Sequence, residues 1–444
     1  MNVFKIKRLN VSVSFKKRLP VLGAGLVVFG CSTTVMGLEL GVEAFGDLRS
    51  TDNAEQALDG SFDEIISEYG LKVSTANIAE NYSYDLAYDY SKTTYDENSQ
   101  DDVDITTGYG GMHFGKKEAP LGLDIVHSRE RTLIGSGVSD NLENSDVRSI
   151  TDIDPNLKLK LGAVDFLIIS AGVTEIRYQE QELKDSTRYG GELQWAHRVS
   201  RTTSFGLMFE HSEVELELYD YKYDKAIVNY QAELRNIAYD LSAGYNRTVS
   251  DEIEFNAPSY DVNIRYIDDT RTLGMRISSD ITDTSLGDSN RSGIQQAEDN
   301  IELGQADATA VAADRFRSTT YEISLSDTNF QDHWNIDFVL GREREVYKEF
   351  SDEDSTNIYG RMSVKYAFNR RTDFGYERRQ SKIKFDSGEL RGAEDVSDRL
   401  AMELKFSEML EATFYVGRNE WLAASGTVGY TENLFGLRAN YIVY

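Results

Sequence analysis

Large apolar and small polar residues alternate with a period of two along most of this chain. In residues 82–90, Tyr and Leu side chains occupy one face, and Ser, Asp and Ala occupy the other. Successive side chains of a strand point to opposite faces, so this spacing predicts β-strands rather than helices. The same alternation recurs at 38–44, 157–161, 358–368 and 400–406. We therefore predict an all-β protein.

Two kinds of connection separate the alternating segments. Short polar turns stand at 198–202 and 369–372, whereas long acidic stretches lie at 92–104, 132–154 and 283–314. Alternation of tight and long connections is typical of a transmembrane antiparallel β-barrel, with short periplasmic turns and long extracellular loops. The chain is therefore predicted to form such a barrel.

The strand number follows from the count of alternating segments. Each segment has about nine to fourteen residues, close to the length that a tilted strand needs to cross a bilayer. Residues 225–247 and 420–444 each divide in more than one way. We predict about 18–20 strands, with 16 as an alternative, because bacterial barrels have even numbers.

The first 37 residues have the layout of a secretory signal peptide. Basic residues precede an apolar run at 19–30, and Gly37 ends a small-residue cleavage site. We predict that residues 1–37 are cleaved and that 38–444 form the barrel, with the long loop described above. A lipoprotein signal acylated at Cys31 is the alternative.

Composition limits the classes of partner. The 444 residues include 75 Asp and Glu, 47 Lys and Arg, and 1 Cys, with a net charge of −28. Loss of residues 1–37 removes the cysteine and six basic residues, which brings the net charge to −34. This acidity argues against nucleic acid as a partner. The lack of cysteine in the mature chain argues against a disulfide scaffold.

The end of the chain favours the outer membrane of a Gram-negative bacterium. Residues 437–444 alternate and finish on Tyr444. This aromatic ending resembles the C-terminal signature that the barrel assembly machinery recognises. We expect outer-membrane lipid, lipopolysaccharide and that machinery as partners.

Closure and strand number together predict a polar interior. In lipid, unpaired backbone groups are costly, so the sheet must close. With this many strands, side chains cannot fill the lumen. Charged residues on the inward face are candidates to line a pore. They are Lys72, Asp85, Asp89, Asp124, Lys158, Lys160, Glu192, Asp240, Asp261, Arg265, Asp337, Arg361, Lys365, Glu403 and Lys405.

Candidate catalytic groups are few, and we expect no enzyme. The glycine-rich run at 108–115 precedes no helix, which a dinucleotide-binding loop requires. His127 and His211 are conceivable acid–base groups of a barrel hydrolase, but each stands where ordinary polar residues occur at strand ends. No G-x-S-x-G or H-E-x-x-H motif is present.

We also expect no cofactor and no dedicated metal site. Acidic residues cluster at 96–102 and 352–354, where Ca²⁺ or Mg²⁺ is conceivable. Neither cluster has the spacing of an EF-hand loop. Solvated loop charge is the alternative interpretation.

The mature chain resembles one family in the composition of its strands and turns and in its last residue. The acidic, Tyr-rich strand at 81–91, the Arg-containing turns at 197–203 and 369–372, and the aromatic end are similar to β-barrel porins encoded in exopolysaccharide gene clusters. Some of these accompany exosortase (PEP-CTERM) systems. The resemblance implies an outer-membrane pore that helps a surface polysaccharide to leave the cell, with export components as partners. Passage of small solutes, a non-conducting structural or adhesive barrel, and a barrel hydrolase are the alternatives. The long loop at 283–314 does not fit a simple open pore, because it is long enough to fold inward as a plug.

Overall fold

The structure is a computed structural model. It describes residues 39–56, 62–116, 119–134, 144–217, 219–250, 253–285, 307–308, 314–330, 333–387, 392–423 and 429–443. The predicted signal peptide and Tyr444 lie outside these ranges. Within the described ranges the chain forms 21 strands and two single-turn 3-10 helices, and no helix there is long and apolar enough to cross a membrane.

The strands are β1 (Glu39–Thr51), β2 (Glu64–Ile78), β3 (Tyr82–Tyr95), β4 (Val103–Phe114), β5 (Leu121–Leu133), β6 (Ser145–Lys160), β7 (Asp165–Tyr178), β8 (Ser186–Arg198), β9 (Thr203–Leu216), β10 (Asp220–Glu233), β11 (Ile237–Ser250), β12 (Ile253–Ile267), β13 (Arg271–Asp283), β14 (Asp307–Ala308), β15 (Arg315–Phe330), β16 (Trp334–Tyr347), β17 (Ser355–Asn369), β18 (Thr372–Phe385), β19 (Gly392–Lys405), β20 (Leu410–Ala423) and β21 (Gly429–Val443). The helical turns are η1 (Glu182–Lys184) and η2 (Ser351–Glu353).

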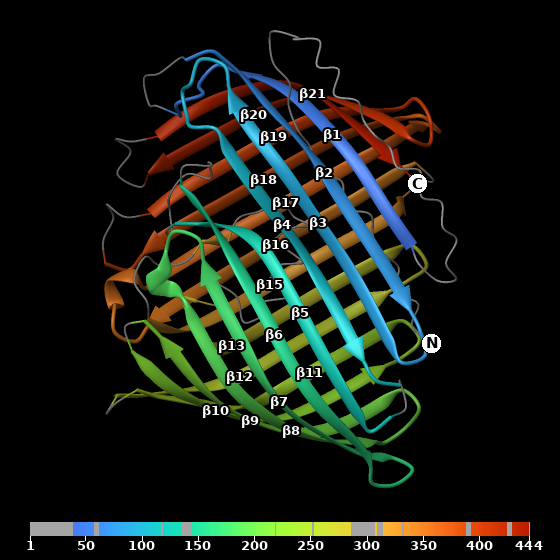
Figure 1. Ribbon diagram of the computed structural model, residues 1–444, viewed down its shortest axis with the longest axis vertical. Coiled ribbons are helices and arrows are strands. Elements are labelled where there is room, and N and C mark those ends of the chain that lie inside the picture. Colours follow the sequence, from blue (N-terminus) through green and yellow to red (C-terminus); the bar gives the residue numbers. More distant parts are fainter. Residues whose placement is uncertain are drawn as a thin grey trace.

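The sheet closes on itself as a barrel (Figure 1). Each long strand pairs antiparallel with the next along the chain, and β13 pairs directly with β15. The last strand, β21, pairs antiparallel with β1, from Val42 opposite Val443 to Thr51 opposite Leu434. The two-residue β14 stands apart, because it pairs in parallel with the end of β5. Every long strand therefore has two neighbours.

The strand number corrects the sequence-based expectation. Apart from β14, the 21 strands of the described ranges leave 20 in the barrel, so the 16-strand alternative is wrong. Both ambiguous stretches contain a connection between two strands, at 234–236 and at 424–428. The all-β barrel class itself is what the structure has. The strands are longer than the hydrophobic layer requires, and this length makes the number of strands hard to count from the alternating segments.

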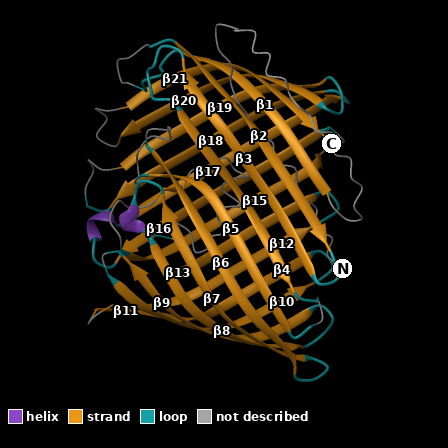
Figure 2. Ribbon diagram, in the orientation of Figure 1, coloured by secondary structure: helices purple, strands orange, loops and turns teal. Residues whose placement is uncertain are grey.

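The two ends of the barrel differ. At one end the connections are short, for example 199–202 between β8 and β9 and 370–371 between β17 and β18. The opposite end carries longer connections, including 179–185 and 348–354, where η1 and η2 lie (Figure 2). Two connections at that end are exceptions, because only residues 217–219 separate β9 from β10 and only residues 251–252 separate β11 from β12.

The outer wall carries an apolar belt next to the short-turn end. On β9 the outward positions are Phe205, Leu207 and Phe209, and His211 and Glu213 continue the row toward the long-loop end. Phe209 is 53% exposed, as expected for a side chain that faces away from the barrel. The strands thus extend beyond the belt by several polar positions, which explains their length.

Candidate functional site: the charged interior of the barrel

Strand alternation places the predicted pore-lining residues on the face opposite to the apolar belt. On β2, Leu71 and Val73 are 49% and 43% exposed, and Lys72 between them turns inward. Cross-strand register carries the same parity around the barrel, since Lys72 lies opposite Asp89 and Leu71 opposite Tyr90. All fifteen predicted residues share this inward parity. Their role in conduction stays a prediction.

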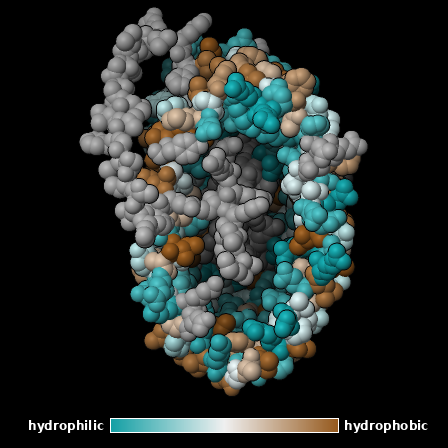
Figure 3. Space-filling model, turned by 90° about the vertical axis from the view of Figure 1, so that its right-hand side faces the viewer, coloured by the Kyte–Doolittle hydropathy of each residue, from teal (hydrophilic) through white to brown (hydrophobic). Residues whose placement is uncertain are grey.

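The barrel is hollowed at its short-turn end. Figure 3 looks at this end and shows hydrophilic residues along the inner margin of the opening. Closed, 20-stranded walls enclose more space than side chains from the wall can fill. Hydrophilic residues therefore border the opening of the barrel at this end.

Some predicted residues pair with one another across neighbouring strands. Lys72 lies 4.0 Å from Asp89, and Lys365 lies 2.5 Å from Glu403. In the same way, Arg265 and Asp240 form an ion pair of 3.2 Å.

Other predicted residues pair with groups that the sequence analysis did not select. The partners are His113 for Asp124 (2.6 Å), Arg276 for Asp261 (2.8 Å), Glu377 for Arg361 (3.1 Å) and Asp373 for Lys405 (3.0 Å). Among the described side chains, Lys158, Lys160, Glu192 and Asp337 form no ion pair. The interior thus carries charges of both signs, some in ion pairs and some outside them.

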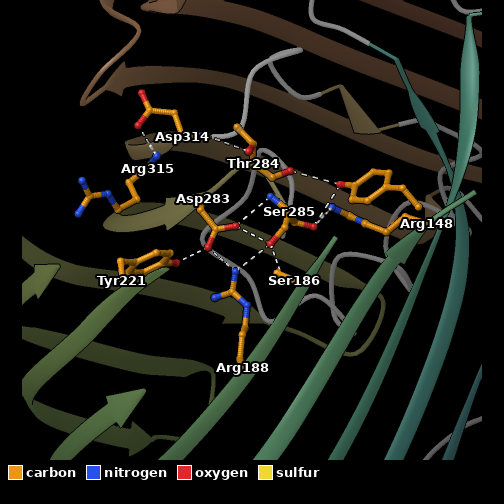
Figure 4. A network of polar contacts seen from close by, with 10 residues as sticks. Arg148, Ser186, Arg188, Tyr221, Asp283, Thr284, Ser285, Asp314 and Arg315 are labelled. Carbon is orange, nitrogen blue, oxygen red and sulfur yellow. Dashed lines mark hydrogen bonds and ion pairs between the residues drawn. The ribbon is translucent and has the colours of Figure 1, made fainter. Parts of the chain in front are cut away.

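A second polar cluster lies inside the barrel near the long-loop end (Figure 4). At the end of β13, Asp283 contacts side chains from strands that are not neighbours of β13. The side chains of Asp283, Thr284 and Ser285 are fully buried. Arg188 of β8 forms an ion pair with Asp283, and the Tyr221 hydroxyl of β10 donates a hydrogen bond to the same carboxylate.

Further hydrogen bonds fix the next two residues against the wall. The Tyr178 hydroxyl donates to the carbonyl oxygens of Thr284 (3.2 Å) and Ser285 (3.1 Å). The Arg188 guanidinium donates to the Ser285 hydroxyl at 3.0 Å, and the hydroxyls of Ser186 and Ser285 lie 2.8 Å apart. This start of the long connection is therefore anchored to β7 and β8. We name residues 283–285 the anchor segment.

The far part of the same connection also reaches the opposite wall. Asp307 and Ala308, which form β14, pair in parallel with Thr132 and Leu133 at the end of β5. The expectation of a plug concerns residues 283–314, of which 286–306 and 309–313 lie outside the described residues. The anchor segment continues directly from β13, with the Thr284 N–H donating to the Asp314 carbonyl oxygen at 3.1 Å, whereas β14 pairs with β5. Plugging itself stays a prediction.

A buried ion pair supports the wall beside the anchor segment. Arg148 and Glu130 are 0% and 2% exposed in their side chains, and their nearest atoms lie 2.5 Å apart. Arg148 also donates to the Ser285 carbonyl oxygen at 3.4 Å. Two charges removed from water must compensate each other, so the pair fixes β5 to β6 at this level.

The sequence analysis missed these contacts. They join residues about 100 positions apart, such as Tyr178 and Thr284, and no local pattern marks them. Asp283 appeared only as the boundary of a loop. The one available signal was a polar Asp-x-Ser sequence directly after an alternating strand.

The two histidine candidates do not form one site. His127 lies on β5, with its Nδ1 2.5 Å from the Tyr88 hydroxyl and its Nε2 3.0 Å from the Ser149 hydroxyl. His211 lies on β9 and is paired with Asp224 at 2.7 Å. Both histidines have outward parity, since they alternate with inward-facing residues. A catalytic role for either one remains untested.

The acidic clusters serve as backbone caps at three connections of the long-loop end. In each, a tyrosine N–H at the end of a strand donates to an aspartate seven residues later. The pairs are Tyr95 with Asp102 (3.3 Å), Tyr178 with Asp185 (2.7 Å) and Tyr347 with Asp354 (2.7 Å). Among the described residues, no group of three or more His, Cys, Asp or Glu side chains is placed to hold a metal ion.

A second acidic residue completes each cap. It lies at the start of the strand before the hairpin, or directly before that strand. Asp146 accepts the N–H groups of Glu180 and Gln181, and Asp314 accepts those of Glu349 and Phe350. In the first connection Glu64 accepts the N–H of residue 97. We name these three connections the capped hairpins.

Burial perturbs the acids of the capped hairpins. It raises the pKa of Asp185 and Asp354, although the hydrogen bonds from Tyr178 and Tyr347 act in the opposite direction. Burial also raises the pKa of Asp314, against three backbone hydrogen bonds. The cost of desolvation therefore exceeds the gain from these hydrogen bonds.

Comparison with known proteins gives only distant likenesses. No protein-family model and no curated protein matches this sequence. The siderophore receptor PirA from Acinetobacter baumannii is 9% identical, with a TM-score of 0.48 over 91% of this chain and 80% of that one. The FrpB iron transporter from Neisseria meningitidis, as apoprotein, is 11% identical, with a TM-score of 0.46 over 90% and 81%.

A loop-deletion mutant of OmpT, an outer membrane protein of Vibrio cholerae, is 10% identical, with a TM-score of 0.38 over 92% of this chain and 100% of that one. Similarity this distant identifies neither the family nor the activity of this chain. The barrel is established by its own strand pairing.

Proposed function

We propose that this protein is a porin-like conduit in the outer membrane of a Gram-negative bacterium, supporting export of a surface polysaccharide or passage of small solutes. The observation that carries the proposal is the two-sided wall. One face of each strand forms the apolar belt, and the other presents charges such as Lys72 and Asp89 to the lumen. A bilayer favours the first face and water the second.

Three further features support the membrane assignment. The closed ladder leaves no open sheet edge among the long strands, as hydrocarbon surroundings require. Residues 1–37 have the layout of an export signal, and the mature chain lacks cysteine. Outer-membrane lipid, lipopolysaccharide and the barrel assembly machinery are the partners that such a protein requires. Polysaccharide export components are proposed from the family resemblance.

A structural or adhesive barrel is the second candidate, because a specific observation favours it. Two described parts of the long connection contact the wall away from β13, because the anchor segment is held by Tyr178 of β7 and β14 pairs with the end of β5. A conduit that this connection closes permanently carries no current. We propose no enzymatic activity and no bound cofactor.

Planar-bilayer conductance of the refolded mature chain tests the proposal. The second sample is a variant in which residues 286–306 are replaced by a short Gly/Ser linker. Stable current steps in the intact chain, scaling with salt concentration, support the conduit. Steps in the variant alone support a conduit that a partner opens. No steps in either sample, with both proteins shown to be folded by heat-modifiable migration, would contradict the conduit and favour the structural barrel.

A further inference from the structure

Five arginines form an arc on the interior wall where the last strands meet the first. They are Arg361 of β17, Arg379 of β18, Arg399 of β19, Arg438 of β21 and Arg49 of β1. We name them the arginine arc. Outward neighbours such as Met362, Leu400 and Leu437 are 40%, 56% and 38% exposed. The arc therefore lies at the level of the apolar belt, away from the anchor segment.

The arc concentrates positive charge in an acidic protein. Arg361 lies directly opposite Arg379, an arrangement of like charges that is unfavourable by itself. Glu377 contacts both of them, at 3.1 Å from Arg361 and 2.8 Å from Arg379, and it lies opposite Arg399. One carboxylate is thus shared by three guanidinium groups.

A second carboxylate is shared in the same way. Asp47 is within electrostatic reach of Arg49, Arg438 and Arg399. Both of its oxygens already accept the Tyr415 hydroxyl, at 2.9 Å. Glu68 and Glu432 act on Arg49 from either side.

The wall carboxylates leave donors of the arc unused. Glu432 is itself held by Thr51 and Asn419. The Nε atoms of Arg49 and Arg399 and one Nη of Arg438 are buried and have no hydrogen-bond partner among the described groups. The arc therefore has more donors than the wall satisfies.

Flat aromatic rings lie beside the arc. A Cβ on Gly436 would stand 2.2 Å from the ring of Tyr415, and a Cβ on Gly341 would stand 2.2 Å from the ring of Tyr359. The two glycines thus let both rings lie against the wall. The Arg399 guanidinium stacks over the Tyr415 ring at 3.9 Å.

We propose that the arginine arc binds the carboxylate groups of an acidic saccharide on the interior wall. A planar guanidinium matches a carboxylate in a two-bond geometry, and rings of arginines select anions in pores. Aromatic faces pack against the C–H faces of sugar rings. Tyr415 is only 6% exposed beneath Arg399, so the half-buried Tyr359 is the ring that favours a saccharide over a simple anion. The side chains of Arg361 and Arg379 are 29% and 37% exposed, so a ligand in the lumen can reach them. This inference rests on the proposed conduit and names its substrate class.

Calorimetric titration of the folded, detergent-solubilised mature chain tests the site. The probe is trigalacturonate, with maltotriose as the neutral saccharide and inorganic phosphate as the simple anion. The test variant is Arg361→Gln/Arg379→Gln. The control is Arg378→Gln, which removes a charge from the same strand but on the outer wall, where Arg378 pairs with Asp398 at 3.0 Å.

We expect trigalacturonate to bind the intact chain and the control alike, and the double variant at least about tenfold more weakly. Maltotriose should bind none of the three proteins measurably. Equal binding of trigalacturonate to all three proteins overturns the site. Equally tight binding of phosphate overturns the assignment to a saccharide.

Conductance separates the failure of this inference from that of the conduit. Binding that depends on Arg361 and Arg379, with no current in either the intact chain or the 286–306 linker variant, supports the arc and rejects the conduit. If the chain shows current steps but trigalacturonate neither binds it nor blocks the current, the conduit is supported and the arc is rejected as a binding site. Block that is lost in Arg361→Gln/Arg379→Gln and retained in Arg378→Gln supports both.

Discussion

Replacement of Arg148 by methionine should be among the most destabilising single changes in this barrel. The substitution keeps a long unbranched side chain and removes the charge. Glu130, 2% exposed in its side chain, then stays buried without its 2.5 Å partner, and the Ser285 carbonyl loses a donor. Removal of one member of a buried pair costs about 3–5 kcal/mol. We expect a loss of unfolding free energy in that range.

A matched surface pair in the same protein serves as control. Arg177 and Glu175 have a similar separation of 2.7 Å, but both side chains are 50% exposed. Water screens such a pair, so Arg177→Met should cost about 0.2–1 kcal/mol. The double variant Arg148→Met/Glu130→Leu should lose less than Arg148→Met, because it also removes the carboxylate that the single change leaves buried without Arg148.

Urea titration in lipid vesicles measures these differences, with fluorescence of the three tryptophans as the signal. The midpoint and the slope are both needed, since a change in slope indicates a different unfolded state. Equal losses for Arg148→Met and Arg177→Met would refute the reasoning, because burial would then have no effect. A double variant that is weaker than Arg148→Met alone would refute the pairing.

Three further predictions concern other parts of the barrel. Gly436→Ala places a Cβ 2.2 Å from the Tyr415 ring and should cost about 1–3 kcal/mol in urea titrations, whereas Gly375→Ala, with no atom within 4 Å, should cost far less. Burial raises the pKa of Asp314 above 3.8, so its contribution to the unfolding free energy is largest at acid pH and falls as pH rises through the folded pKa. The stability advantage of the native chain over Asp314→Asn should therefore shrink from pH 4 upward, and a constant difference would contradict this. Asp354→Ala removes the 2.7 Å acceptor of the Tyr347 N–H and should speed protease cleavage at 348–354 but not at 179–185.

The barrel was readable from the sequence because alternation is a local property. Each strand shows which of its side chains face inward, and Lys72, Glu403 and the other candidates were placed on that basis. The strand number was harder, because outward polar positions such as His211 and Glu213 extend the strands past the belt and obscure their ends.

Neighbour relations were beyond the sequence pattern. Alternation shows on which face of a strand a residue lies. It does not show which residue lies opposite on the neighbouring strand. Arg361 was selected, but its position opposite Arg379 follows only from the pairing of β17 with β18. The anchor segment depends in the same way on the diameter and closure of the barrel. The capped hairpins did leave a signal, a tyrosine followed seven residues later by aspartate, which recurs in three acidic loops.

These capped hairpins tie three consecutive strands together at each connection. One acid lies in the connection itself, and the second lies at the start of the strand before the hairpin, as with Asp185 and Asp146 of β6 at the end of β7. A cap is therefore complete only where the preceding strand is also present. Duplication or loss of one hairpin would change the circumference by two strands and leave both chain ends on the same side. A lineage of this protein can vary the width of its barrel by whole hairpins, provided that each capped connection keeps the acid of the strand before it.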